Sequence, residues 1–280
     1  MPSKSPKSSL NRGGRPRGPV PFCQRNIKLT LEYDGSRFFG FQRQEGRPTI
    51  QAALEGALSK LFNRPMKIAA AAGRTDAGVH AAGQIVNFKT DSALPPEKIR
   101  KGLNAFLPKE IAVKRAEEVA RDFHARYSAR SKTYEYRVLN SDVRSPLVNG
   151  RAYHYRHPLD LGRMRKAVGK LLGQRDFKSF QAAGSSAKSS VRHVRRFAIT
   201  QSKGLVLFTI EANGFLYHMV RNLVGTLLEV GRGNLSLNDL QTLTQKRDRT
   251  LAGPTVPAAG LTLVSVRYED TGKVAKSGRF

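Results

Sequence analysis

The sequence predicts an α+β fold in which two ferredoxin-like halves share a mostly antiparallel sheet and enclose a central basic cleft. Apolar residues alternate along several short segments, which is typical of half-buried strands, and recur at helical spacing in other segments between them. In each half the expected order is strand, helix, two strands, helix, strand, which is the ferredoxin-like order. Lys and Arg outnumber Asp and Glu by 49 to 21, so a basic binding surface is expected.

The first 26 residues have the composition of a disordered basic tail. They are rich in Ser, Lys, Arg, Gly and Pro, and the first acidic residue of the chain is Glu32. Such a segment has too little apolar surface to fold by itself. An organellar transit peptide is the alternative, because it is also rich in Arg and Ser, but the prolines oppose the amphipathic helix that it needs. A second short tail is expected at 271–280.

The N-terminal half, residues 27–125, is expected to carry the catalytic Asp. Its first strand ends in the turn Asp34-Gly35, and its second helix starts after a double proline. A hairpin follows the first helix. The expected strand, helix, hairpin, helix and strand lie at 27–33, 49–62, 66–71 with 84–88, 96–106 and 111–119.

The C-terminal half, residues 126–270, repeats this order of elements without an obvious repeat of sequence. A strand rich in aromatic residues opens it, as β propensity favours, and a helix with an apolar stripe follows. The expected strand, helix, two strands, helix and final strand lie at 134–139, 161–172, 193–200, 205–212, 215–230 and 262–268.

The formal charge of +28 indicates a polyanionic partner, most simply a nucleic acid. An anionic membrane surface is the alternative. However, no apolar run approaches the roughly 20 residues that a transmembrane helix needs, and no signal peptide follows Met1. The single cysteine, Cys23, excludes an intrachain disulfide framework and fits a reducing cytoplasm.

A glycine-framed loop contains the most informative carboxylate of the chain, Asp76. Gly73 and Gly78 stand on either side of it, and glycine permits backbone angles and close approaches that a side chain would prevent. Loops held by strands at both ends are frequent positions for catalytic groups. The alternative is that Asp76 only closes a turn, as Asp often does.

Other familiar chemistries lack their residue patterns. The six histidines are scattered, and the closest pair, His154 and His157, fits surface or RNA contact better than a metal site. The chain has no Walker loop, Rossmann fingerprint or G-x-S-x-G elbow, and the acids nearest to Asp76 in sequence are Glu55 and Asp91. We therefore expect neither a metal nor another cofactor.

The segment Gly73-Arg74-Thr75-Asp76-Ala77-Gly78-Val79-His80-Ala81 resembles the signature motif of the tRNA pseudouridine synthase A family. One departure is Phe41, where the family often carries Trp; this aromatic change is expected to be tolerated. The resemblance covers about residues 27 to 268. Further segments match in the same order, at 31–35, 40–44, 122–126, 132–136 and 215–222.

The resemblance implies an isomerase that converts uridine to pseudouridine at positions 38 to 40 of the tRNA anticodon arm. Asp76 would be the nucleophile and Arg221 its partner. Tyr134 would stack on the target base and take part in proton transfer. Arg74 would hold the backbone or help to eject the base. The family further implies a homodimer, and no association with a membrane is expected. A carboxylate can attack the sugar or the uracil, or remove a sugar proton, without a cofactor.

Each assignment has an alternative. Tyr134 alternates with Tyr136 as aromatic residues of a strand do, so it would also fit the core. Arg221 lies on an expected polar helix stripe with His218 and Asn222, so it would also fit a solvated charge. For the whole protein, a non-catalytic RNA-binding protein or RNA chaperone would explain the charge and the aromatic residues. A phosphate-ester enzyme would need a metal-binding cluster that the sequence lacks.

Overall fold

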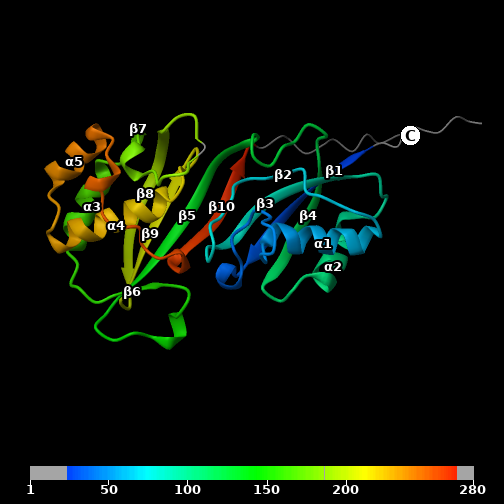
Figure 1. Cartoon of the computed structure of the whole chain (residues 1–280), viewed down its shortest axis with the longest axis horizontal. Helices are drawn as coiled ribbons and strands as arrows, with labels where there is room; N and C mark the ends of the chain where they lie inside the picture. The colour runs from blue at the N-terminus through cyan, green and yellow to red at the C-terminus, as the bar shows by residue number, and fades with distance from the viewer. Residues whose placement is uncertain (1–23, 186, 270–280) are drawn as a thin grey trace, which may run out of the picture.

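The N-terminal half of the computed structural model has the predicted order of elements (Figure 1). The structure describes residues 24–185 and 187–269, so most of the first tail and the whole second tail lie outside the described residues. The first strand begins at Arg25, slightly before the expected residue 27. The elements of this half are β1 (Arg25–Tyr33), α1 (Ile50–Phe62), β2 (Ala70–Ala71), β3 (His80–Thr90), α2 (Pro96–Phe106) and β4 (Ile111–Val119).

The C-terminal half contains the six predicted elements and three more. The short strands β6 and β7 and the helix α5 were not predicted. The two strands are too short for a clear period, whereas α5 was missed although Ser236 caps it and Leu237, Leu240 and Leu243 recur at helical spacing. The elements are β5 (Ala129–Asn140), β6 (Tyr153–Tyr155), α3 (Leu161–Gly169), β7 (Gly173–Asp176), β8 (Val191–Ser202), β9 (Leu205–Ala212), α4 (Met219–Arg232), α5 (Leu237–Lys246) and β10 (Leu261–Tyr268).

All the described strands belong to one ten-stranded sheet, whose main path runs β4-β1-β3-β10-β5-β9-β8-β7. The four strands of the N-terminal half, numbered in chain order, lie side by side as β4-β1-β3-β2, which is the order 4-1-3-2. In the C-terminal half, β5, β8, β9 and β10 are the first to fourth of the four corresponding strands, and they lie as β10-β5-β9-β8, which is the same order. Most pairs are antiparallel; β10 with β3 and β6 with β5 are parallel. The predicted α+β fold of two ferredoxin-like halves is confirmed.

Strand β10 joins the two halves. It pairs in parallel with the start of β3 and antiparallel with β5, so it lies between them in Figure 1. Leu263 of β10 is opposite both Ala81 of β3 and Tyr134 of β5, and Ala81 is opposite Tyr33 of β1. One row of residues therefore crosses the sheet from Tyr33 to Tyr134 through the junction of the halves.

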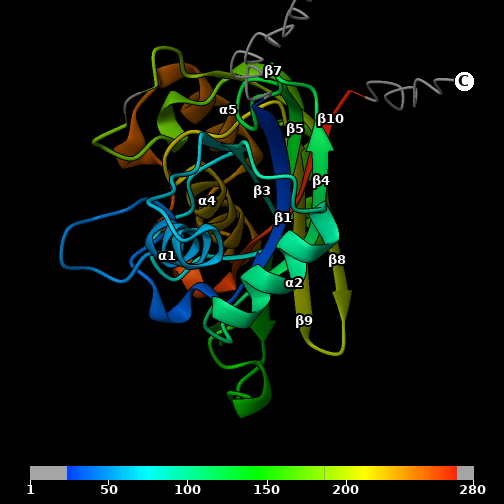
Figure 2. The same cartoon turned by 90° about the vertical axis from the view of Figure 1, so that its right-hand side faces the viewer.

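Helices α1, α4 and α5 lie on the same side of the sheet (Figure 2). One hydrophobic cluster contains buried side chains of both halves, including Leu29 of β1, Leu54 of α1, Phe208 of β9 and Leu227 of α4. The predicted boundary between residues 125 and 126 falls in the connection from β4 to β5, and the division into two domains remains a prediction. Along the described chain, no helix combines the length and apolarity that a membrane crossing requires.

Local signals explain where the helices that frame the site begin. Thr49 caps α1, since its hydroxyl accepts a hydrogen bond from the Ala52 N–H at 3.3 Å. The expected helix at 215–230 instead begins at Met219, because His218 has a left-handed backbone (φ 57°) that an α-helix cannot contain. The prediction of its start was therefore wrong by about one turn.

Candidate active site

Asp76 lies in the loop between β2 and β3, and three hydrogen bonds fix this loop to its surroundings. The buried Tyr33 hydroxyl and Thr75 Oγ1 are 2.8 Å apart. The Gln84 amide donates to the Gly73 carbonyl at 2.8 Å, and the Phe41 N–H donates to the Thr75 carbonyl at 2.9 Å. The residues on both sides of Asp76 are thus anchored, which limits the positions that its carboxylate can take.

Gly40 allows the neighbouring segment to approach this loop. Its φ is +87°, and a Cβ at this position would lie only 2.8 Å from the Thr75 carbonyl oxygen. Any side chain would therefore be strained in backbone angle and would also clash with the loop. The adjacent Phe41, the residue that departs from the family pattern, is buried and supports the loop with its backbone N–H.

The carboxylate of Asp76 is not the cap of its own turn. Val79 N–H donates to the backbone carbonyl of Asp76 at 3.1 Å, whereas no backbone N–H of the described residues donates to its carboxylate. The side chain is 29% exposed. This arrangement leaves the carboxylate oxygens available to other groups and favours the functional interpretation over turn closure.

Two side chains from the start of α4 approach Asp76. Arg221 Nη1 lies 3.7 Å and His218 Nε2 lies 3.4 Å from Asp76 Oδ2. Arg221 is 15% exposed, and its Nε donates to the Val256 carbonyl at 2.7 Å. A half-buried guanidinium that is held in place beside a carboxylate is not a solvated helix charge.

His218 is the neighbour of Asp76 that the sequence did not single out. It is the residue just before α4 and has a positive φ. A strained backbone angle in a bulky residue is frequent at functional positions. Burial lowers the pKa of His218 below its ordinary 6.5; Arg221 and Arg249 act in the same direction, while Asp76 opposes them. The imidazole is therefore neutral at pH 7. His218 lies in the matching segment 215–222 beside Arg221, which was the available signal, but its φ cannot be read from helical periodicity.

Tyr134 reaches the same place from β5. It is 8% exposed, and its ring meets the Phe215 ring edge-on, with centroids 4.9 Å apart. Burial raises the pKa of its phenol, and the nearby Tyr33 and Asp76 add to this effect. The phenol is therefore protonated at neutral pH, and the charge of Asp76 reaches it. Tyr134 is therefore both a well-packed side chain and a neighbour of the candidate site.

Arg74 and Asn222, which the sequence also placed near the site, lie in different surroundings. Arg74 is exposed, and among the described residues it has no ion pair or hydrogen bond. The hydrogen bonds that hold the backbone of the loop come from Tyr33, Gln84 and Phe41, and the role of Arg74 remains a prediction. Asn222 is fully buried and donates to the Phe180 carbonyl at 2.9 Å, so it does not belong to a polar surface stripe.

His80, at the end of the motif, supports the loop from behind. The Gly35 N–H donates to its Nδ1 at 3.1 Å, and its Nε2 lies 3.0 Å from the Gly150 carbonyl and 3.1 Å from that of Ala259. Burial, aided by Arg151, lowers the pKa of His80. A neutral imidazole that accepts at one nitrogen and donates at the other matches these contacts.

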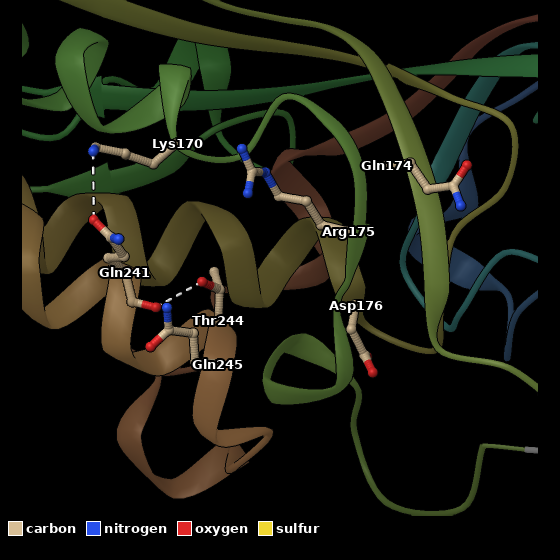
Figure 3. Close-up of a pocket in the computed structure, with 7 residues that line it drawn as sticks. All are labelled: Lys170, Gln174, Arg175, Asp176, Gln241, Thr244 and Gln245. Atoms are coloured by element: carbon tan, nitrogen blue, oxygen red, sulfur yellow. Dashed lines mark hydrogen bonds between the residues drawn. The ribbon is translucent and has the colours of Figure 1, made fainter.

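A cavity of about 350 Å³ lies away from these residues, between β7 and α5 (Figure 3). Its lining is polar and includes Lys170, Arg175, Asp176 and Gln241. Lys170 Nζ donates to Gln241 Oε1 at 3.4 Å across it. None of the four predicted site residues lines this cavity. Within 24–185 and 187–269, no three His, Cys, Asp or Glu side chains are grouped as metal ligands would be.

Comparison with known proteins gives one consistent result. The family model described as "tRNA pseudouridine synthase" matches residues 30–128 and 167–269. The chain is 48% identical to tRNA pseudouridine synthase A of Chromobacterium violaceum over 87% of this chain and 93% of that protein. The protein of the same name from Acetivibrio thermocellus is 43% identical over 87% of this chain and 100% of its own length. That from Actinobacillus pleuropneumoniae is 44% identical over 90% and 95%.

Proposed function

The chain belongs to the tRNA pseudouridine synthase family and isomerises uridine to pseudouridine in tRNA; we propose that Asp76, Arg221 and Tyr134 perform this reaction. The observation that carries the proposal is the approach of Arg221 and His218 to the Asp76 carboxylate at the junction of the two halves. We further propose that the targets are uridines 38 to 40 of the anticodon arm.

The reaction exchanges one bond to the sugar for another. The bond from C1′ to N1 of uracil breaks, the uracil turns, and a bond from C1′ to C5 forms; C5 loses a proton and N1 gains one. Asp76 supplies the carboxylate that attacks the sugar or the uracil, or removes a sugar proton. The protein needs no redox partner for this sequence because no electrons are gained or lost overall.

Arg221 stabilises the negative charge of Asp76. The guanidinium and the carboxylate attract each other, and this attraction grows as RNA excludes water from the site. The hydrogen bond from Nε to the Val256 carbonyl orients the guanidinium, so its Nη1 lies near Asp76 before any RNA is bound. Electrostatic groups that are positioned in advance need no reorganisation during the reaction.

Tyr134 provides an aromatic surface and a hydroxyl. Because burial raises its pKa, it enters the reaction as a neutral phenol that can donate a hydrogen bond. The uridine must leave its stack before Asp76 can reach it, and an aromatic ring at the site would replace part of the lost stacking. We propose that Arg74, which is exposed on the loop, helps to eject the uridine from the RNA stack.

Mapping of modified positions tests this proposal. Purified protein is incubated with an unmodified tRNA transcript without added metal, and pseudouridine is located by chemical labelling and primer extension. Pseudouridine at positions 38 to 40 is expected. Tight tRNA binding without pseudouridine would instead support an RNA-binding protein or RNA chaperone, and pseudouridine elsewhere would contradict the proposed positions.

We also propose that the protein acts as a homodimer in the cytoplasm, as the resemblance implies. Leu147 is 94% and Val143 is 74% exposed, both in the segment between β5 and β6, and such side chains are often covered in an assembly. Light scattering coupled to size-exclusion chromatography measures the mass directly. A single-chain mass at micromolar concentration would contradict the dimer.

A further inference from the structure

Lys132 brings a positive charge to Gly73, near the start of the Asp76 loop. It lies two residues before Tyr134 on β5, and because side chains alternate along a strand, both occupy the same face of the sheet. Its Nζ lies against Gly73, where an added Cβ would be 3.2 Å away. Gly73 is three residues from Asp76. The ammonium therefore lies against the Asp76 loop at Gly73, three residues before the proposed catalytic carboxylate.

In the part of the chain that the structure describes, this ammonium has no anionic partner. Among residues 24–185 and 187–269, Lys132 forms no ion pair and no hydrogen bond, although it is only partly exposed. The nearby Glu211 is engaged by Ser131 at 2.7 Å and by Arg267 at 3.6 Å. Withdrawing an ammonium from water without a partner is unfavourable, so its position is explained if an anion arrives from outside.

The charged side chains that influence Lys132 are themselves positive. Burial first, and then Arg126 and Arg192, lower the pKa of Lys132 to about 8. Arg192 donates to the backbone carbonyls of Ser189 and Val191 at 2.9 and 2.6 Å, so its charge is fixed in position and not neutralised. No carboxylate of the described chain pairs with Arg126 or Arg192. Three mutually influencing cations that lack a carboxylate partner among the described residues have the charge pattern that attracts an anion.

We propose that Lys132, with Arg126 and Arg192, binds a phosphodiester next to the target uridine and thereby positions its ribose over Asp76. This inference rests on the proposed function, because the anion is assigned to the tRNA backbone. The geometry favours it: a nucleotide whose base meets Tyr134 and whose sugar meets Asp76 has its phosphates within reach of the neighbouring strand position. Lys132 is thus a positioning residue, distinct from the three proposed catalytic groups.

Charge variants of Lys132 test the assignment. Lys132→Met keeps the length of the side chain and removes its charge, whereas Lys132→Arg keeps the charge. Lys114→Met is the matched control, because Lys114 is exposed and paired with Glu32 at 3.1 Å. For Lys132→Met we expect about tenfold weaker tRNA binding at 0.1 M salt and a log–log salt slope smaller by roughly 0.7 to 0.9, the value of one phosphate contact. Lys132→Arg and Lys114→Met should remain within about twofold of the wild type.

The pH dependence of binding separates this role from a purely structural one. Since phosphate binding requires the charged amine, wild-type affinity should fall, by up to about tenfold, between pH 7 and 9. The Lys132→Arg variant should show no such fall. Equal pH dependence of the two proteins would overturn the proposal.

An uncharged phosphate analogue locates the contact. Anticodon-arm RNAs that carry one methylphosphonate on the 5′ or the 3′ side of the target uridine are compared on the wild type and Lys132→Met. At one of the two positions, the losses of binding affinity caused by the methylphosphonate and by Lys132→Met should be strongly non-additive, because both changes remove the same interaction. Additive losses at both positions would overturn the inference while wild-type turnover still upholds the proposed function. A wild type that makes no pseudouridine would refute that function instead.

Discussion

The Arg221 guanidinium lies 3.7 Å from the Asp76 carboxylate and is held there by its hydrogen bond to the Val256 carbonyl. Asp76 belongs to the loop before β3, and Arg221 belongs to α4 in the other half of the chain. The β10 strand, which pairs with both β3 and β5, sets the two halves side by side. The candidate site thus depends on the junction of the halves, and neither half contains it alone.

Substitution of Arg221 should reduce turnover much more than tRNA affinity. In Arg221→Lys the charge remains, but a single ammonium cannot both approach Asp76 and keep the contact to Val256 that the guanidinium makes. We expect a loss of about 10²- to 10³-fold in the single-turnover rate, as for other preorganised electrostatic groups. Arg232→Lys, at the far end of α4, is the control and should stay near the wild-type rate. Weaker binding with unchanged turnover would make Arg221 a phosphate contact.

Two variants of Tyr134 distinguish its ring from its hydroxyl. Tyr134→Phe keeps the packing on Phe215 and should bind tRNA normally, while the single-turnover rate falls by at least about tenfold because proton transfer is impaired. Tyr134→Ala also removes a buried ring, so both affinity and thermal stability should fall. If Tyr134→Phe were as active as the wild type, the hydroxyl would have no part in the reaction.

Acid should destabilise the fold through His80. Burial lowers its pKa in the folded state below the ordinary 6.5, so as the pH falls through about 6.5 the unfolded chain takes up this proton first. Stability therefore declines from about pH 7 downward, until the folded pKa is passed. His80→Gln should flatten the change of melting temperature between pH 7.5 and 5.5. The exposed His193→Gln is the control, and equal slopes in all three proteins would refute this account.

Deletion of residues 1–23 should weaken tRNA binding and flatten its salt dependence. The deletion stops before β1 because Arg25 pairs with Glu118 at 2.7 Å, and its loss would disturb the fold. Each phosphate contact contributes roughly 0.7 to 0.9 to the slope, and we expect only some of the basic residues to contact phosphates at the same time, so the slope should decrease by about two to three. Saturated turnover should hardly change. Equal binding by both proteins at every salt concentration would favour a transit peptide. The basic residues removed are Lys4, Lys7, Arg12, Arg15 and Arg17.

The long elements could be predicted because their apolar residues recur with a clear period. The prediction of β9 at 205–212 matches the strand Leu205–Ala212, where every second residue is buried. The strands β6 and β7 offer too few alternations, whereas α5 carries a capping box and leucines at helical spacing that were overlooked. The apolar run 66–71 was also overestimated, since only Ala70 and Ala71 pair with β3.

The site could be predicted where a motif carries it and not where tertiary contacts create it. Asp76, Tyr134 and Arg221 were named from their motifs, and the structure brings them together at the junction of the halves. His218 was missed because its role depends on a backbone angle. Lys132 belongs to the matching segment 132–136, but the sequence could not show that its ammonium lies against Gly73 and is influenced by Arg126 and Arg192 and not by a carboxylate. Those neighbours are set by the tertiary fold.

The central claim is that the Asp76 carboxylate drives the isomerisation, and the single-turnover rate of Asp76→Asn tests it most directly. The amide has nearly the same shape but is neither nucleophilic nor basic, so tRNA binding and melting temperature should match the wild type. Asp142→Asn, at an exposed Asp without a partner among the described residues, is the control and should be fully active. We expect the rate of pseudouridine formation by Asp76→Asn to fall by at least about 10³-fold. A tenth of the wild-type rate in freshly purified Asp76→Asn protein would contradict the claim.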